Sequence, residues 1–265
     1  MRYVLLVTLL ISSGVFSYEF ENVLKLAEQG DAEAQVNLGH MYLHGEGVPQ
    51  NGIEAIKWYR KAAEQGEAWA QTILGTSYHM GNGVPENHTE ALKWYLKAAK
   101  QGNVLAQYSA GYLYDFGDGV TNNDAEAVRW YRKAAEQGEA NAQLKLGYKY
   151  SEGKGVRKDD IEAIKWYRKS AEQGVALAQI CLAQGYKRQA DILDRIGLLV
   201  GVHEENGSRE RQIEAYVWAS MGATQGMETG KKLLREFKEI MTQEEIAKGQ
   251  ELASKCWQSN FKDCD

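Results

Sequence analysis

Apolar and small residues recur along this chain with a period of 36 positions. The glycine that closes each apolar segment, Gly66, is matched by Gly30, Gly102, Gly138 and Gly174, each 36 residues from the next. A period of this length is typical of stacked helix pairs, in which each unit buries its apolar face against its neighbours. The pattern therefore predicts an all-α solenoid of antiparallel helix pairs.

Each unit contains two segments with apolar residues at helical spacing, here called helix A and helix B. The fixed positions of the first unit are Gln35, Leu38, Gly39 and Tyr42 on helix A, and Ala55, Trp58, Tyr59, Ala62 and Ala63 on helix B. Steps of three and four residues place each set on one face of its helix. We interpret these positions, aromatic residues included, as core and not as a cofactor site.

Glycine and asparagine mark the helix ends within each unit. Gly45 and Gly47 follow the first helix A, as expected for residues that adopt the left-handed conformation after a helix. Asn51 stands three residues before Glu54, and the same spacing recurs at Asn87/Glu90, Asn123/Glu126 and Asp159/Glu162. This spacing predicts a capping box at the start of each helix B, with the Glu reaching back to the cap residue.

The chain begins with a pattern typical of a secretory signal peptide. Arg2 precedes an apolar run from Val4 to Ile11, and small residues lead to Ser17. The run is too short for a permanent membrane anchor. We expect residues 1–17 to be removed, giving a periplasmic or secreted protein without membrane insertion of the mature chain.

The remaining chain divides into a repeat array and two caps. We predict an N-terminal capping helix at 18–30, five repeats at 31–226, and a C-terminal capping helix pair with a tail at 227–265. The step from Gly174 to Gly226 is 52 residues, so the fifth repeat carries a 16-residue insertion. The insertion includes Ile192 to Val200 at helical spacing, and it is either an extended helix on the neighbouring unit or a partner-contacting projection.

Composition and cysteine content narrow the function classes. The net charge is −5, and the 31 basic residues are interpreted as spread one or two per helix, which argues against nucleic acid as a partner. Of the cysteines Cys181, Cys256 and Cys264, the last two are close in sequence. In an oxidising compartment they are expected to form a disulfide, leaving Cys181 as a buried thiol.

The repeated motif resembles a known family. The pattern A-x-A-Q-x-x-L-G-x-x-Y, then G-x-G-V, then A-x-x-W-Y-x-x-A-A-x-x-G is similar to the Sel1-like repeat (SLR) family of the tetratricopeptide-like superfamily. The resemblance to a secreted bacterial member implies a right-handed superhelix that serves as a protein-interaction scaffold. Some cysteine-rich members carry a β-lactamase label, and others look like periplasmic immunity proteins that neutralise secreted phospholipase toxins.

Candidate catalytic and metal-binding residues are few. Ser151 and Lys154 match the S-x-x-K motif of penicillin-recognising enzymes, but the companion motifs S-D-N and K-T-G are absent, and the match falls at a repeat joint. His40 and His44 stand at i and i+4, a spacing that suits one metal ion, without an apparent third ligand. We therefore expect no catalytic residue, no cofactor and no metal site.

The variable positions of helix A point to a partner-binding face. Taking Gln35 as the core direction, the opposite side of helix A carries apolar and aromatic residues in several units, and helix A lines the inner, concave face in this superfamily. The predicted partner-binding residues are Trp69, Ile73, Met80, Leu105, Tyr112, Phe116, Tyr148 and Arg188. Exposed apolar residues of this kind mark protein interfaces, although the same residues could instead pack between successive A helices.

The sequence favours a non-catalytic scaffold that binds another protein. The specific hypothesis is an inhibitor or immunity protein for a secreted toxin such as a phospholipase effector. The alternatives are an envelope adaptor or exported host-interaction factor, and a weak penicillin-binding or β-lactamase-like enzyme.

Overall fold

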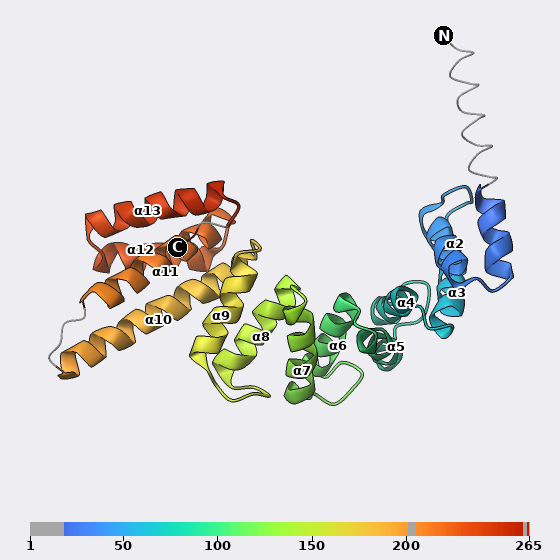
Figure 1. The fold of residues 1–265 in the computed structure, drawn as a ribbon, viewed down its shortest axis with the longest axis horizontal. Coiled ribbons are helices and arrows are strands. Elements are labelled where there is room, and N and C mark those ends of the chain that lie inside the picture. Colours follow the sequence, from blue (N-terminus) through green and yellow to red (C-terminus); the bar gives the residue numbers. More distant parts are fainter. Residues whose placement is uncertain (1–18, 201–204, 262–263, 265) are drawn as a thin grey trace, which may run out of the picture. The chain divides into compact units, whose positions relative to one another are not determined.

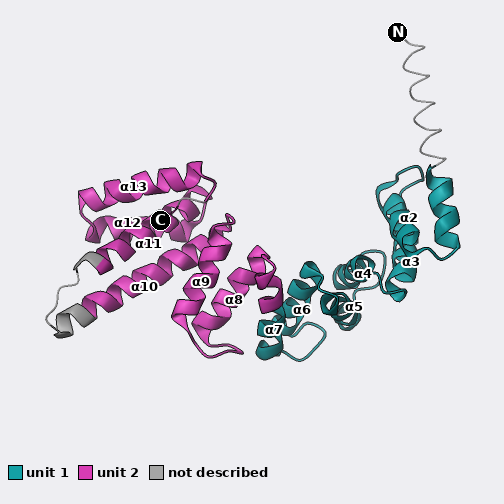
Figure 2. Ribbon diagram, in the orientation of Figure 1, with its two compact units in different colours: residues 1–130 teal, residues 131–265 magenta. Residues whose placement is uncertain are grey.

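The computed structural model describes residues 19–200, 205–261 and 264. The predicted signal segment, residues 1–17, and the predicted start of the N-terminal cap at residue 18 lie outside the described residues. The chain forms two compact units, residues 1–130 (unit 1) and residues 131–265 (unit 2), coloured separately in Figure 2. We describe each unit by itself.

Every regular element of the described residues is an α-helix (Figure 1), so the predicted all-α solenoid is confirmed. A helix over residues 19–28 opens unit 1. The A helices of this unit are α2 (Ala32–His44), α4 (Ala68–Met80) and α6 (Val104–Phe116), and its B helices are α3 (Gly52–Glu64), α5 (His88–Lys100) and the first part of α7 (Asp124–Glu136). Unit 2 continues with α8 (Ala140–Glu152), α9 (Asp160–Ala171), α10 (Ala176–Val200), α11 (Glu205–Thr224), α12 (Glu228–Ile240) and α13 (Gln243–Gln258).

The helix ends follow the sequence signals, with one correction. Gly45 ends α2 with φ +76°, and its N–H donates to the Met41 carbonyl. Asn51 caps α3 by accepting from the N–H groups of Ile53 and Glu54. The predicted reciprocal bond from Glu54 is wrong, because the Asn51 N–H donates to the Tyr42 carbonyl at 2.7 Å and the Glu54 carboxylate lies 2.6 Å from Lys57 Nζ.

The same forward pairing recurs at Glu90 with Lys93, Glu126 with Arg129 and Glu162 with Lys165. A complete capping box forms at the start of α13, between Thr242 and Glu245.

Close approach of helix A to helix B explains the fixed glycine. A Cβ atom on Gly39 would lie 2.7 Å from the Tyr59 ring, which is fully buried beneath it. The same 2.7 Å separation recurs at Gly75 with Tyr95 and at Gly147 with Tyr167. Each B-helix tyrosine therefore fills the space that a helix A side chain would occupy.

A buried glutamine joins successive repeats. Gln71 Nε2 donates to the Ala63 carbonyl at 3.0 Å, and Gln71 Oε1 accepts from Gln101 Nε2 at 2.9 Å. In this way one side chain connects the end of the preceding helix B with the end of the following one. The same bonds recur at Gln35 and, in unit 2, at Gln143 and Gln179.

The glutamine pairing locates the insertion in unit 2. Gln143 and its donor Gln173 are 30 residues apart, whereas Gln179 and its donor Gln225 are 46 residues apart. The difference equals the 16 residues expected from the sequence, and α10 accommodates them by extending to 25 residues and pairing with α11. Of the inserted apolar residues, Ile192 is exposed, whereas the side chains of Ile196, Leu199 and Val200 lie outside the described ones.

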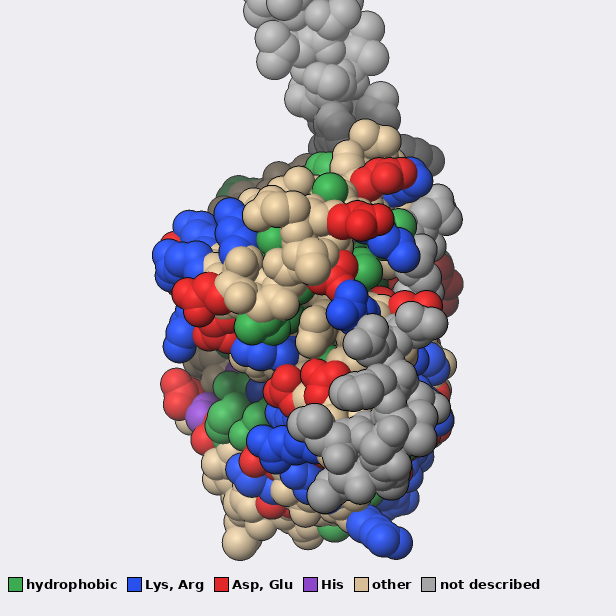
Figure 3. Space-filling model, turned by 90° about the vertical axis from the view of Figure 1, so that its left-hand side faces the viewer, with side chains coloured by type: hydrophobic (Ala, Val, Ile, Leu, Met, Phe, Trp, Pro, Cys, Tyr) green, Lys and Arg blue, Asp and Glu red, His purple; other side chains and the backbone are tan. Residues whose placement is uncertain are grey.

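Helices α12 and α13 close the C-terminal end of unit 2. Phe237 of α12 is fully buried, and both helices contact α11. Cys256 is disulfide-bonded to Cys264, the pairing expected from their spacing, and Cys181 is a free, partly buried thiol. Figure 3 shows acidic and basic side chains interspersed at this end of the molecule, with hydrophobic ones only in small groups.

The disulfide is expected to stabilise the end of unit 2. It closes a loop with a sequence separation of 8, for which the loss of unfolded-state entropy corresponds to roughly 2.5 kcal/mol. Cys264→Ser should therefore lower the free energy of unfolding of unit 2 by about this amount in a urea titration. Cys181→Ala serves as the control for loss of a thiol. If both changes lowered the free energy of unfolding equally, the stabilisation could not be attributed to the disulfide.

Candidate protein-binding surface

Large apolar side chains are exposed on the A helices of unit 1. Met80 is 61% exposed, Leu105 56%, Phe116 54% and Trp69 44%, whereas Ile73 and Tyr112 are half-buried. We call the six residues Trp69, Ile73, Met80, Leu105, Tyr112 and Phe116 the aromatic surface. They lie on α4 and α6, which contact each other within unit 1.

Ring contacts hold the aromatic surface in place. Trp69 packs edge-on against Tyr59, with ring centroids 5.7 Å apart, and lies 6.4 Å from the ring of His40. The Tyr112 and Phe116 centroids are 4.5 Å apart. Ile73 and Tyr112 also contact the buried core of their repeats. The packing interpretation therefore applies to Ile73 and Tyr112, whereas the other four side chains are 44% to 61% exposed, and their role in binding a partner stays a prediction.

Four of the five histidines flank the aromatic surface. The rings of His40 and His44 are 4.3 Å apart, and those of His79 and His88 are 4.9 Å apart. His79 also lies edge-on to Tyr112, with centroids 6.2 Å apart, and its Nδ1 is buried without a hydrogen-bond partner among the described residues. Burial, followed by the charge of His88, lowers the pKa of His79 below its usual value.

The lowered pKa of His79 predicts that unit 1 loses stability in mild acid. The unfolded chain binds this proton more readily than the folded chain, so stability rises with pH through the region below about 6.5. We expect the thermal midpoint to fall when the pH is lowered from about 7.5 to about 5.5, because His79 must then be charged in its buried position. His79→Phe keeps a ring against Tyr112 and should flatten this dependence, and an unchanged pH profile in the variant would contradict the assignment.

The charges of unit 1 are segregated between the two kinds of helix. Helices α2, α4 and α6 and the joints that follow them contain no Lys or Arg, while each joint carries one acid, namely Glu46, Glu86 and Asp118. The expectation of basic residues on every helix is therefore wrong, because those of the unit 1 repeats lie on the B helices. There Lys57 pairs with Glu54, Arg60 donates to the Tyr78 hydroxyl, and Lys61 Nζ lies 3.7 Å from the centroid of the Trp58 ring.

The two remaining predicted partner-binding residues lie in unit 2. Tyr148 of α8 is 44% exposed, and Lys154 Nζ lies 5.5 Å from its ring centroid. Arg188 of α10 is exposed and lies 3.4 Å from the carboxylate of Asp160. Both residues line the same cavity, together with the free thiol of Cys181.

The Ser151 hydroxyl is engaged in local hydrogen bonds. Its Oγ donates to the Tyr148 carbonyl at 2.9 Å and lies 3.2 Å from the hydroxyl of Tyr167. Burial raises the pKa of Tyr167, which stays protonated at neutral pH and cannot act as a base. The described contact of Lys154 is with the Tyr148 ring. The structure therefore supplies Ser151 with no activating base among its described contacts.

This geometry predicts that Ser151 is not a nucleophile. Wild-type protein and Ser151→Ala should give the same rate of hydrolysis of a chromogenic cephalosporin, equal to the buffer rate. The absorbance of the released product measures it. Turnover by the wild type that disappears in Ser151→Ala would establish the enzyme alternative instead.

Two kinds of feature, a cluster of metal-binding side chains and a membrane-spanning helix, are absent from the residues that the structure describes. Among the residues that the structure describes, no three His, Cys, Asp or Glu side chains gather closely enough to hold a metal ion. Within the same residues, no helix is both long and apolar enough to cross a bilayer.

The fold and the exposed A-helix residues define a helical repeat protein of the scaffold type. Residues 32–67, 70–103, 104–139 and 140–175 match the model of the Sel1 repeat. The chain belongs to the Sel1 repeat family, and the fifth predicted unit, which carries the insertion, lies outside the matched residues. No curated protein matches the chain.

Solved structures show the same architecture. The Sel1 repeat protein from Oxalobacter formigenes is 32% identical, with a TM-score of 0.66 over 90% of this chain and 98% of that one. The protein c5321, a protective antigen present in uropathogenic Escherichia coli strains displaying an SLR fold, is 30% identical with a TM-score of 0.63. That match covers 94% of this chain, which spans 62% of the length of c5321.

A more distant similarity concerns the immunity protein Pa5087 from Pseudomonas aeruginosa. It is 21% identical, covering 84% of this chain and 74% of that one, with a TM-score of 0.41. At this level the similarity carries no argument about the function of this chain.

Two features of the surface escaped the sequence interpretation. The absence of Lys and Arg from the A helices of unit 1 is readable from the sequence once the helices are separated into A and B. The cavity that brings together residues of three helices could be found only in the structure. Asp160 and Tyr167 lie on α9, Tyr148 lies on α8, and Cys181 and Arg188 lie on α10.

Proposed function

We propose that this chain is a non-catalytic scaffold that binds another protein through the aromatic surface of unit 1. The observation that carries the proposal is the exposure of Trp69, Met80, Leu105 and Phe116 on two adjacent A helices. Clustered exposed aromatic and aliphatic side chains of this kind mark interfaces, and Trp and Tyr are frequent hot spots.

The charge distribution indicates what kind of partner fits. Helices α2, α4 and α6 contribute Glu33 and Asp115 as their charged residues besides histidine, and each following joint adds one acid. A partner surface with an apolar centre and a basic rim would complement this arrangement, whereas an acidic rim would be repelled. The proposed partner is therefore a protein that presents Lys or Arg around apolar side chains.

The more specific proposal is an inhibitor or immunity protein that acts in the periplasm on a toxic enzyme such as a phospholipase effector. The expected signal peptide supports this proposal, together with the apolar side chains exposed on the aromatic surface. One-to-one capture of an enzyme, with loss of that enzyme's activity in the complex, is the expected behaviour.

Affinity capture tests the proposal. The purified protein serves as bait against envelope and culture-supernatant extracts, in the presence and absence of added salt, because the proposed contacts include charged rims. A single stoichiometric partner with a basic surface, whose activity is inhibited, supports the inhibitor proposal. Several envelope proteins would replace it with an adaptor, and no specific partner in any extract would contradict binding in the periplasm.

A further inference from the structure

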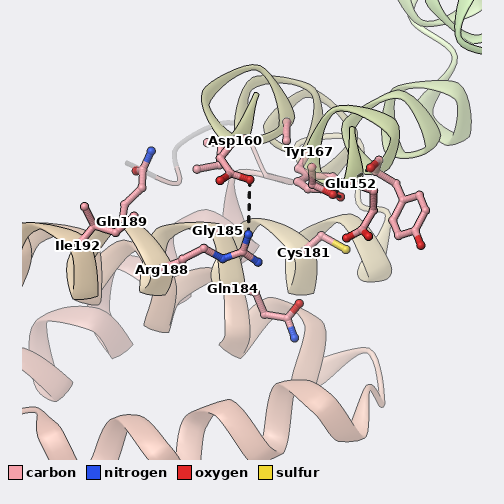
Figure 4. Close-up of a pocket in the computed structure, with 13 residues that line it drawn as sticks. Glu152, Asp160, Tyr167, Cys181, Gln184, Gly185, Arg188, Gln189 and Ile192 are labelled. Carbon is pink, nitrogen blue, oxygen red and sulfur yellow. Dashed lines mark hydrogen bonds and ion pairs between the residues drawn. The ribbon is translucent and has the colours of Figure 1, made fainter. Parts of the chain in front are cut away.

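A cavity of 180 Å³ lies in unit 2 between α8, α9 and α10. Its walls combine aromatic, aliphatic and polar side chains from the three helices, and Figure 4 shows Glu152, Asp160, Cys181 and Arg188 among them. The lining includes Tyr148, Glu152, Asp160, Tyr167, Arg188 and Ile192. A space of this volume accepts a group about the size of a benzene ring or the end of one long side chain.

The insertion builds one wall of this cavity. In the four preceding repeats helix A ends at a glycine, as α8 does at Gly153. In the fifth repeat Gln189 occupies the equivalent position, and α10 continues for more than two further turns. Gln189 and Ile192, which line the cavity, lie on these additional turns. The insertion thus completes a cavity that a helix ending at residue 188 would leave open.

The charges around the cavity leave one carboxylate unpaired. Asp160 accepts from Arg188, and Lys158 lies 4.0 Å away on its other oxygen. Glu152 has no cation within ion-pair distance among the described residues, and its side chain points toward Cys181 in Figure 4. Burial raises the pKa of Cys181 to about 11, so the thiol is neutral at physiological pH. The net charge of the lining is therefore negative, and it is concentrated at Glu152.

Hydrogen-bond acceptors gather at the same end of the cavity. Because Ser151 Oγ–H donates to the Tyr148 carbonyl, the Tyr167 hydroxyl donates to Ser151, and its oxygen is an acceptor that also faces the Cys181 thiol. Glu152 adds two carboxylate oxygens, and Tyr148, which is 44% exposed, adds an aromatic ring whose centroid lies 5.5 Å from Lys154 Nζ. A planar, delocalised cation matches this combination better than a compact ammonium, because it can pair with a carboxylate through two N–H groups and stack on a ring.

We infer that this cavity binds a guanidinium group, with Glu152 as the anionic partner and Tyr148 as the stacking surface. The group is either the arginine side chain of a protein partner or a free small guanidino compound. The first source agrees with the basic partner proposed for unit 1, but the cavity does not depend on that proposal, since all its residues belong to unit 2.

Calorimetric titration of the purified protein tests the inference with two ligands. Agmatine represents the free compound, and the capped peptide Gly-Gly-Arg-Gly-Gly represents the protein side chain; the same peptide with citrulline, neutral and nearly isosteric, is the ligand control. We expect millimolar or tighter binding of a guanidinium ligand and no binding of citrulline. Preference for the peptide identifies a partner's arginine, and preference for agmatine identifies a small molecule. No binding of either overturns the inference.

Matched variants assign the binding to the named residues. Glu152→Gln removes the unpaired carboxylate and should weaken binding at least 10-fold, while Glu251→Gln on α13 should leave it unchanged. Ile192→Ala tests the wall supplied by the insertion, with Ile240→Ala on α12, a similarly exposed isoleucine, as its control.

Alkylation of Cys181, the free cysteine of the chain, should be slowed by the bound ligand in the wild type. Equal affinities of Glu152→Gln and Glu251→Gln for the guanidinium ligand would contradict the proposed site. So would alkylation of Cys181 at an unchanged rate when the protein is saturated with that ligand.

Discussion

Truncation of Trp69, Tyr112 and Phe116 to alanine is expected to abolish partner capture while leaving the helical fold intact. Trp69 and Phe116 expose about half of their surface on unit 1. Their truncation should therefore weaken partner binding more than it lowers the stability of the fold. Central aromatic residues of interfaces cost about 2 kcal/mol or more each when truncated, and losing even two of them weakens binding by at least about 100-fold. Pull-down yield and the dissociation constant of the recovered partner measure the effect.

Stability should change only modestly in this triple variant. Trp69 packs edge-on against Tyr59, and Tyr112 packs against Phe116 and His79. Aromatic pairs of this kind contribute about 1 kcal/mol each beyond their buried area, which corresponds to a few degrees in the melting temperature. The double variant Leu26→Ala/Ile53→Ala removes exposed apolar residues from elsewhere in unit 1 and should retain binding. Collapse of the helical signal in the triple variant would show that its residues are core.

The second large effect is expected from Gln71→Ala, in the core of unit 1. Gln71 is 4% exposed, and its side chain bonds both the Ala63 carbonyl and the Gln101 amide. Its removal leaves the buried Ala63 carbonyl without this donor and creates a small void. We expect a loss of about 2–4 kcal/mol in the free energy of unfolding, measured by urea titration.

Gln101→Ala is the matched control for this prediction. Gln101 is exposed, so water can replace its bonds to Gln71 and to the Gly66 carbonyl, and the loss should stay below about 1 kcal/mol. The double variant should lose less stability than the sum of the two single losses, because both changes remove the Gln71–Gln101 bond. Equal losses in the two single variants would contradict the assignment of Gln71 as the joint between repeats.

The fold could be predicted because the same residue types recur at the same packing positions in successive repeats. Gly39 and its equivalents are needed where a tyrosine ring lies 2.7 Å from the missing Cβ, and Gln35 and its equivalents are needed where two helix ends meet. Because these core residues recur in successive repeats, they can be distinguished in the sequence from the surface residues, which vary. What failed was the side-chain detail at the start of helix B. The Asn51 N–H donates to the Tyr42 carbonyl of the preceding helix A, so Glu54 pairs with Lys57 instead.

The candidate surfaces were predictable to different degrees. The aromatic surface of unit 1 follows from helical geometry, since Trp69, Tyr112 and Phe116 occupy positions opposite the core stripe. The cavity of unit 2 could not be predicted, because it depends on where α10 continues after the missing joint glycine and on how Asp160 of α9 meets Arg188. An insertion has no equivalent in the other repeats, so the period gives no information about its packing.

The most direct test of the binding surface is site-specific photo-crosslinking in the otherwise intact chain. A photoreactive phenylalanine derivative replaces Met80, Phe116 or, as a control on α3, Ile53, all of which are exposed in unit 1. The protein is then irradiated in the presence of the captured partner. Crosslinks from positions 80 and 116, and none from position 53, are the predicted result. A crosslink from position 53 without any from positions 80 and 116 would contradict binding through the aromatic surface.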